Sequence, residues 1–316
     1  MKHRYLYVLA APLAVALASC GGSHNPSVPV VTGPTPTPSP SPSPTPTPTP
    51  SAPSASYDKS SDFDRDRSFN AIGLRVVTST PPSGLEAALD SRIDAESVSV
   101  GFDFAATTQT YRARYIGENL LAATQRKSYS PSNYTYDVYS QGQTSFTRSP
   151  SFIGASYVGY VLWTDSIAAV SNNPSSQINR LMIFGSRTLV NDLPTAGVRS
   201  FTGLSSTFGG VASEGRAATI NVNYSSHMVT VTSAYQPPAA GSAGSGSNQI
   251  TEPFTMSGTF DPATGRISGT VSYQSTTGSG KFEGALYGPQ SAEAGILFSG
   301  ARPDGRPFYG FIIAKG

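Results

Sequence analysis

The sequence predicts an all-β protein whose C-terminal half is an eight-stranded antiparallel meander β-barrel, preceded by a second β-rich region. Charged residues make up only 13% of the chain, whereas Gly, Tyr and Phe are abundant from Tyr57 onward. Runs of alternating apolar and polar residues recur, separated by turn-forming residues. Eight such runs follow one another in the C-terminal half, which is the pattern of a meander that closes into a barrel.

Residues 1–19 have the composition of an export signal. A positive segment at residues 2–4 precedes an apolar stretch at residues 5–17 that is too short to span a bilayer. The next residues, Leu17-Ala18-Ser19-Cys20-Gly21, resemble the lipobox of bacterial lipoproteins, whose cysteine is acylated and becomes the first residue. Because Cys20 is the only cysteine, we expect lipidation there. An ordinary secretory signal cut nearby is the alternative.

Acylation of Cys20 would make the membrane a partner of this protein without a spanning segment. Several acyl chains anchor stably, because each buried CH₂ contributes about 0.8 kcal/mol. In the lipoprotein class that the lipobox resembles, an Asp after the cysteine favours the inner membrane, and here Gly21 follows it. The resemblance therefore implies a lipid anchor in the outer membrane.

Residues 20–56 predict a tether that begins at Cys20. From residue 26 to residue 53 the chain is almost entirely Pro, Thr and Ser. Such a run adopts extended polyproline II at about 3.1 Å per residue, and it would hold the folded part up to roughly 90 Å from the lipid. A polyproline II ligand for a partner module is the alternative.

Residues 57–180 predict the second β-rich region. Leu85, Leu89 and Ile93 fall at helical spacing and are compatible with one short amphipathic helix, whereas the β-rich neighbours favour a strand. The sequence leaves both open. Strand-like alternation occurs at residues 97–104, 110–115, 134–139 and 157–164.

Residues 181–316 predict the barrel. Turns are expected at residues 223–227, 261–265 and 303–305, where Pro, Gly and Asn supply the required backbone angles. The run at residues 308–313 is apolar on both faces, so we expect the last strand to be covered on both sides. The eight expected strands are 197–203, 217–224, 228–235, 253–260, 266–273, 279–287, 294–300 and 307–314.

Two groups of residues carry a resemblance to a known family. The first is Gly185-Ser186-Arg187-Thr188, then Leu193-Pro194-Thr195-Ala196-Gly197 and Phe201-Thr202-Gly203. The second is Gly280-Lys281-Phe282-Glu283-Gly284, then Tyr287-Gly288-Pro289, Glu293, Gly295 and Phe298. In order and spacing they resemble the barrel motifs of transferrin-binding protein B and related surface lipoproteins. The resemblance covers about residues 185–316.

The resemblance implies a fold and structural roles. Residues 57–180 would form the region that is called a handle in that family. Residues 287–289 would turn the chain, Glu293 would satisfy backbone donors there, and Gly295 would permit close packing. Ser291 stands where Ala is usual and Ile296 where a second Gly is usual, which leaves the local turn geometry open.

The resemblance also implies a function, namely a non-catalytic cell-surface lipoprotein that binds a protein or nutrient ligand for iron acquisition. An outer-membrane transporter is a further candidate partner. Transferrin itself is not expected, because this chain has one handle-and-barrel unit where the family's namesake has two.

The sequence offers little for catalysis. Beyond the signal, the histidines are His24 in the tether and His227 in a predicted turn, and no G-x-S-x-G motif presents a serine. The segment 278–281 (GSGK) is followed by Phe282 where a phosphate loop needs Ser or Thr. We therefore expect neither an enzyme nor a cofactor.

We expect no metal site, and two metal-binding interpretations are the alternatives. His227 and Met228 are residue types that ligate haem iron. The acidic residues between Asp58 and Asp66 resemble the start of a calcium loop, although Arg65 and Arg67 interrupt them.

The candidate ligand-binding residues are Tyr129, Tyr134 and Tyr136, in a segment rich in Tyr, Ser and Asn. Antibody paratopes use this composition for rigid contacts with adaptable hydrogen bonds. Tyrosines that merely pack in strands are the alternative.

A net charge of +2 without a basic patch predicts no nucleic-acid partner. Three classes of function are then considered. The first hypothesis is the surface binding lipoprotein, and the alternative is a structural or assembly lipoprotein of the outer membrane that faces the periplasm. An envelope enzyme is the third, and it would need an acid/base pair that we do not find.

Overall fold

The computed structural model describes most of the chain from residue 56 onward. These residues belong to one compact unit, Pro53–Gly316. The signal, Cys20, His24 and the tether before residue 56 lie outside the described residues. No helix among the described residues is long and apolar enough to cross a membrane. The described ranges are 56–63, 65–80, 87–108, 110–119, 121–123, 126–129, 136–141, 144–149, 152–167, 175–208, 213–233, 254–273, 276–302 and 305–316.

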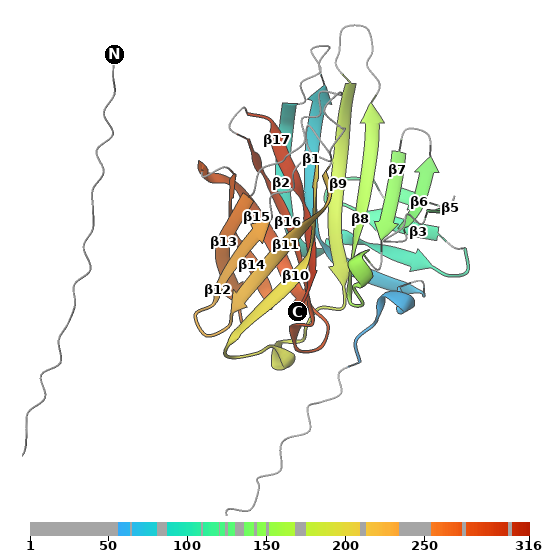
Figure 1. Ribbon diagram of the computed structural model, residues 1–316. Coiled ribbons are helices and arrows are strands. Elements are labelled where there is room, and N and C mark those ends of the chain that lie inside the picture. Colours follow the sequence, from blue (N-terminus) through green and yellow to red (C-terminus); the bar gives the residue numbers. More distant parts are fainter. Residues whose placement is uncertain are drawn as a thin grey trace, which may run out of the picture. The chain divides into compact units, whose positions relative to one another are not determined.

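The C-terminal strands form a closed antiparallel barrel in sequence order (Figure 1). All eight expected strands are present, and β17 pairs with β10 to close the ring. The strands are β10 (Val198–Phe208), β11 (Ser213–Asn223), β12 (Met228–Ser233), β13 (Phe254–Asp261), β14 (Arg266–Tyr273), β15 (Thr276–Tyr287), β16 (Glu293–Ala301) and β17 (Pro307–Lys315).

Side chains fill the barrel interior. Alternation along each strand sends every second residue inward, as in β12, where Val229 and Val231 are buried between exposed neighbours. Three aromatic rings, those of Phe254, Phe298 and Phe308, pack with centroids 5.1 to 5.2 Å apart. The interior is thus a packed core, as is usual for a barrel of this size.

β17 is buried on both faces, which confirms the expectation from its apolar run. Phe308 and Ile312 point into the barrel core. Tyr309, Phe311 and Ile313 belong to a second apolar cluster that the barrel shares with the other sheet. The barrel wall at β17 is therefore also an interface.

The remaining strands form a nine-stranded antiparallel sheet, which we call the handle. Its order is β4-β3-β2-β1-β9-β8-β7-β6-β5, so the chain's first and last handle strands pair at the centre. β9 reaches Gly185, and residues 181–185 thus lie in the handle and not in the barrel to which we assigned them. The strands are β1 (Arg67–Thr80), β2 (Ala87–Ala105), β3 (Thr110–Arg114), β4 (Leu121–Ala123), β5 (Arg126–Tyr129), β6 (Tyr136–Gln141), β7 (Thr144–Ser149), β8 (Val158–Ile167) and β9 (Ser175–Gly185).

The helix considered for residues 85–93 is wrong for the described part of that segment, which is strand from Ala87 onward. Leu89 is exposed, and Ile93 packs toward the cluster shared with the barrel. Pairing with β1, which places Ile93 opposite Leu74, decides the structure. Tertiary pairing outweighs a three-residue helical pattern here.

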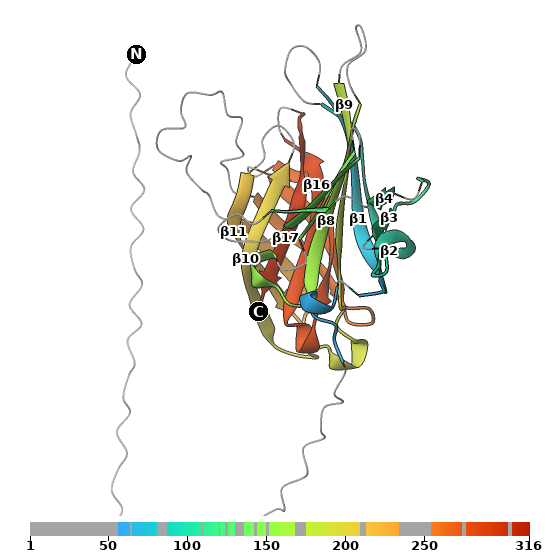
Figure 2. The same cartoon turned by 90° about the vertical axis from the view of Figure 1, so that its right-hand side faces the viewer.

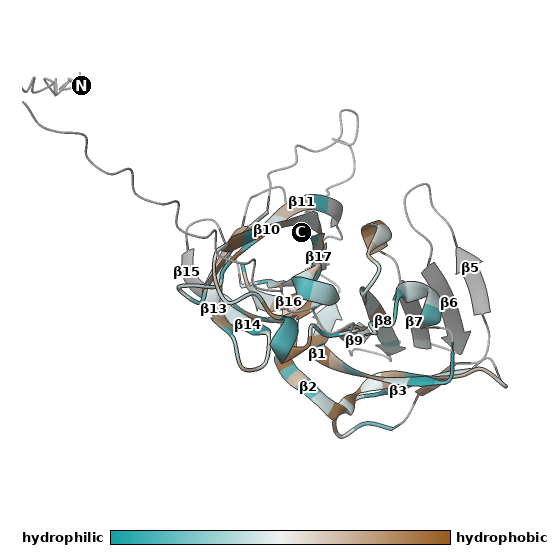
Figure 3. Cartoon of the chain, turned by 90° about the horizontal axis from the view of Figure 1, so that it is seen from below, coloured by the Kyte–Doolittle hydropathy of each residue, from teal (hydrophilic) through white to brown (hydrophobic). Residues whose placement is uncertain are grey.

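The handle has a core on each face. Toward the barrel, Leu74, Leu181 and Ile183 join the shared cluster with residues of β16 and β17. On the other face, aromatic side chains such as Phe102 and Phe184, with ring centroids 4.2 Å apart, form a separate cluster. Figure 2 shows β1, β8 and β9 beside the barrel, and in Figure 3 β2 and β3 lie on the side of β9 and β8 that faces away from the barrel.

Strand directions sort the connections into two ends. The turns at residues 224–227, 262–265 and 288–292 lie at one end, where the described chain also begins at Ser56. β1, β8 and β10 start at this end and finish at the other, where the connections 81–86, 168–174 and 209–212 lie outside the described residues. We call the first of these the tether end.

Phe311→Ala tests the shared cluster. Phe311 stacks on Tyr160 of the handle with centroids 4.2 Å apart and is 1% exposed. We expect a loss of about 3 to 5 kcal/mol in the free energy of unfolding, because the change leaves a cavity between the sheets. Thr230→Ala, an exposed change on β12, is the control and should cost less than about 0.5 kcal/mol. Denaturant titration measures both, and equal losses would contradict the interface.

Candidate binding surface

One buried carboxylate joins the barrel to the handle. Glu293, the first residue of β16, accepts hydrogen bonds from the backbone N–H groups of Ser156, Tyr157 and Val158 at 2.6, 2.8 and 3.1 Å. The family motif implied that Glu293 would satisfy backbone donors at its own turn. It does satisfy backbone donors, but they belong to the start of β8 in the handle. We call this contact the Glu293 latch.

Burial raises the pKa of Glu293 above its ordinary value of 4.5, while the three backbone donors and Lys315 act in the opposite direction. The direction means that removing the carboxylate from water outweighs its hydrogen bonds. The latch therefore depends on pH.

The two motif segments meet around the latch. The N–H of Gly288 donates to the Ser186 carbonyl at 2.8 Å, and the Thr188 hydroxyl donates to the Gly288 carbonyl at 2.8 Å. At Gly295 a Cβ would lie 2.8 Å from Ile183 of the handle, so only glycine permits this approach. These residues of the two motif segments therefore lie at the interface between the two sheets.

The described chain enters the folded unit beside the latch. The Tyr57 hydroxyl donates to the Asp192 carboxylate at 2.7 Å and accepts from the Leu189 N–H at 3.2 Å. Asp192 also accepts from the N–H of Gln290 at 2.9 Å. This Tyr57 clasp fixes the point at which the tether joins the fold, and burial raises the pKa of the Tyr57 phenol.

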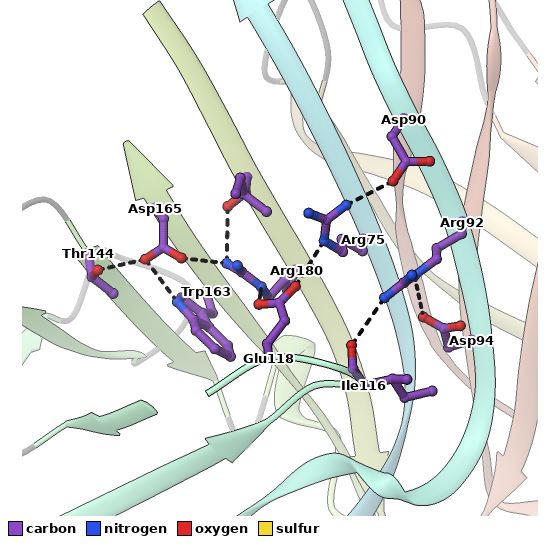
Figure 4. A network of polar contacts seen from close by, with 11 residues as sticks. Arg75, Asp90, Arg92, Asp94, Ile116, Glu118, Thr144, Trp163, Asp165 and Arg180 are labelled. Atoms are coloured by element: carbon purple, nitrogen blue, oxygen red, sulfur yellow. Dashed lines mark hydrogen bonds and ion pairs between the residues drawn. The ribbon is translucent and has the colours of Figure 1, made fainter. Parts of the chain in front are cut away.

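A second polar group lies in the handle, on the face away from the barrel (Figure 4). Arg180 of β9 pairs with Glu118 and, at 2.8 Å, with Asp165. Its guanidinium carbon lies 4.0 Å from the ring centroid of Trp163, whose indole N–H donates to Asp165 at 3.1 Å. The register places Trp163 opposite Arg180, which explains the stacking.

Glu118 holds the connection between β3 and β4 against the sheet. It accepts from Arg75 at 2.9 Å as well as pairing with Arg180. Arg75 lies directly opposite Arg180 on the neighbouring strand, and one carboxylate bridges the two guanidinium groups. This bridge offsets the repulsion between the two guanidinium groups and ties the connection between β3 and β4 to the centre of the sheet.

The network continues to an accessible region on β2. Arg92 lies opposite Arg75, pairs with Asp94 at 3.1 Å and donates to the Ile116 carbonyl at 3.3 Å. Val98 is also exposed, and its carbonyl accepts from Arg114 at 3.2 Å. We call the exposed residues Asp90, Arg92 and Val98 of β2, with Ile116 of the connection after β3, the outer handle surface. Arg92 beside the exposed Ile116 suits contact with another protein.

Of the sequence candidates, Tyr129 and Tyr136 face each other as the last pair of the β5–β6 hairpin at the edge of the handle. Tyr134 lies outside the described residues, as do the side chains of the other two. Their role in binding stays a prediction. Sequence reasoning missed the outer handle surface, although the alternating charges Asp90, Arg92 and Asp94 were a signal for one charged strand face.

Among the described residues, no group of three His, Cys, Asp or Glu could hold a metal ion. Asp58 pairs with Arg67 at 2.9 Å, and Asp62 pairs with Arg65 at 3.0 Å. His227 occupies the turn before β12 with a φ of 57°.

The folded unit is similar to solved structures of transferrin binding protein B. A double mutant from Haemophilus parasuis matches 73% of this chain and 54% of its own, with 12% identity and a TM-score of 0.37. The isotype 1 protein from Neisseria meningitidis matches 77% of this chain and 43% of its own, with 14% identity and a TM-score of 0.39. This chain thus spans about half the length of these proteins. No protein-family model and no curated protein matches the sequence.

Glu293→Gln tests the pH dependence of the latch. A raised pKa means that the folded state holds the proton longer than the unfolded state. The stability contributed by Glu293 is therefore complete below the unfolded pKa and is lost as pH rises through the folded pKa. We expect the wild-type protein to lose stability relative to E293Q as pH rises above about 4.5. Paired denaturant titrations across pH measure this, and a constant difference would contradict it.

Arg180→Met tests the handle network. The change leaves Glu118 and Asp165 without their buried partner, so we expect a loss of about 3 to 5 kcal/mol in the free energy of unfolding. Arg92→Met removes an ion pair whose arginine is 43% exposed and should cost less than about 1 kcal/mol. Denaturant titration measures both variants. Similar losses would contradict a larger contribution to stability from the buried ion pairs than from the exposed one.

Proposed function

We propose that this protein is a lipid-anchored, non-catalytic lipoprotein of the outer-membrane surface that captures a protein or nutrient ligand. The observation that carries the proposal is the filled barrel interior. Apolar side chains such as Phe254, Phe298 and Phe308 occupy the interior of the barrel as far as it is described, and we therefore assign recognition to an outer surface.

The outer handle surface is the recognition site that we propose. It combines the arginine Arg92, part of whose side chain is accessible, with the exposed apolar residues Val98 and Ile116. Below it the network around Arg180 holds the strands rigid, and a rigid support lowers the entropy lost when a partner binds. A protein ligand fits this chemistry better than a small molecule, which would need a concave pocket.

The anchor is proposed from the lipobox at Cys20 and from the composition of residues 20–56. The Tyr57 clasp supports this arrangement, since it joins the tether to the end of the fold that carries the latch. The far end of the strands then points away from the membrane. Iron acquisition is the setting that the motif resemblance suggests, and binding of transferrin by the similar solved structures is a property of those proteins.

Protease treatment of intact cells tests the location. We expect a non-penetrating protease to remove the folded unit from intact cells, with a periplasmic protein as the integrity control. Cys20→Ala should release the protein from the membrane fraction, because the anchor is lost. Protection of the folded unit until the outer membrane is permeabilised would favour the periplasm-facing structural role instead.

A photo-crosslinking residue at position 116 tests binding on the same cells. We expect crosslinks to a second protein from Ile116 on the outer handle surface and none from Thr230, an exposed position on the barrel strand β12. Crosslinks from both positions alike would contradict a specific surface.

A further inference from the structure

The tether end of the fold carries an exposed segment with little charge. Residues 189–198 run from the end of the handle, across the end of the barrel, to the start of β10. Leu189, Val190 and Val198 are 48%, 55% and 66% exposed. Between them only Leu193 is buried, and it belongs to the barrel core. Valine and leucine side chains this exposed are costly in water when they lie together.

The strand register places a fourth exposed apolar residue next to the end of this segment. Val198 pairs with Asn223, and Asn223 pairs with Met228, so Val198 and Met228 lie in one cross-strand row on the same face. Met228 is 47% exposed. We call the four residues Leu189, Val190, Val198 and Met228 the tether-end face.

The charged side chain in this segment already has hydrogen-bond partners within the fold. Asp192 is the only charged residue from 189 to 198. Its carboxylate accepts from the Tyr57 hydroxyl and from the Gln290 N–H. A charge with these partners is directed into the fold, and the segment therefore presents mainly apolar groups to its surroundings.

The same end receives the tether. The Leu189 N–H donates to the Tyr57 hydroxyl at 3.2 Å, so the exposed segment and the first residues of the folded unit are in contact. The chain before Tyr57 runs through 36 residues to Cys20. If Cys20 carries the lipid, the bilayer is the one large apolar phase that the chain holds close to this end.

We infer that the tether-end face rests on the lipid bilayer that holds the anchor. This inference rests on the proposed lipidation of Cys20. Four partly exposed apolar side chains would bind a bilayer weakly from free solution. The tether, however, keeps the folded unit within roughly 90 Å of the bilayer, so the contact is intramolecular and needs less affinity than binding from free solution. The tether is then slack, the folded unit sits at the surface, and the outer handle surface and the far end remain open to a partner.

Tryptophan fluorescence can test this contact directly. The chain has one tryptophan, Trp163, which is 4% exposed and gives a constant background. Met228→Trp places a second tryptophan on the tether-end face. Ile167→Trp is the matched control, because Ile167 is 52% exposed and ends β8 at the opposite end of the strands.

The experiment uses the mature full-length chain, coupled through the Cys20 thiol to maleimide lipid in phosphatidylethanolamine–phosphatidylglycerol vesicles that contain brominated acyl chains. This coupling supplies the anchor whether or not cells acylate the protein. Failure of docking is thus distinguished from failure of the proposed lipidation, which mass spectrometry of the protein from cells reports separately.

We expect the emission of M228W to shift to shorter wavelength and to be quenched by the brominated lipid, while I167W keeps its aqueous emission. A double change, Leu189→Asp with Val190→Asp, should abolish the quenching of M228W. Leu89→Asp, a change at a 63% exposed position on the handle strand β2, should leave it unaltered.

Equal quenching of M228W and I167W, or none in either, would overturn the proposal. A blue shift of M228W that appears without vesicles and grows with protein concentration would also overturn it, because the face would then be an interface between two copies of the chain.

Discussion

The structure depends on a buried carboxylate that one sheet supplies and the other surrounds with backbone donors. Glu293 is satisfied only when the start of β8 lies across the end of β16. That placement brings Ile183 and Val158 of the handle against Gly295, where a larger residue would not fit. The shared apolar cluster, with Phe311 stacked on Tyr160, then has a fixed geometry. The hydrogen bonds to Glu293 are directional, and they fix how the two sheets pack through the non-directional contacts of the apolar cluster.

The polar groups of the handle do a related task on its other face. Arg180 is too buried to lack a partner, and Glu118 and Asp165 supply the opposite charges. Since Glu118 comes from the connection after β3, its pairing with a central strand brings the outer strands over the aromatic cluster. The far side of β2, around Arg92, leaves charged and apolar groups accessible.

Sequence patterns predicted the barrel well because each barrel strand has one face in the core and, for most strands, one face in water. β12 and β13 alternate clearly for this reason. In the handle, β1 and β9 are covered by the barrel on one face and by the curled sheet on the other, and their buried runs lack a two-residue period. The Glu293 latch could be predicted only in part. The motif indicated Glu293, but the backbone donors to its carboxylate lie far away in the sequence. The outer handle surface arises from pairing between strands, which a single strand does not reveal.

The strand order affects how the molecule folds. The central handle pair joins Ala71 to Phe184, and the latch joins Val158 to Glu293. Contacts between residues so distant along the chain close large loops, which makes folding slow. The barrel cannot close before β17 has been made, because β10, its first strand, pairs with β17, its last. In a polypeptide built in this way the barrel stays open until β17 has been made, and it closes only when that strand pairs with β10.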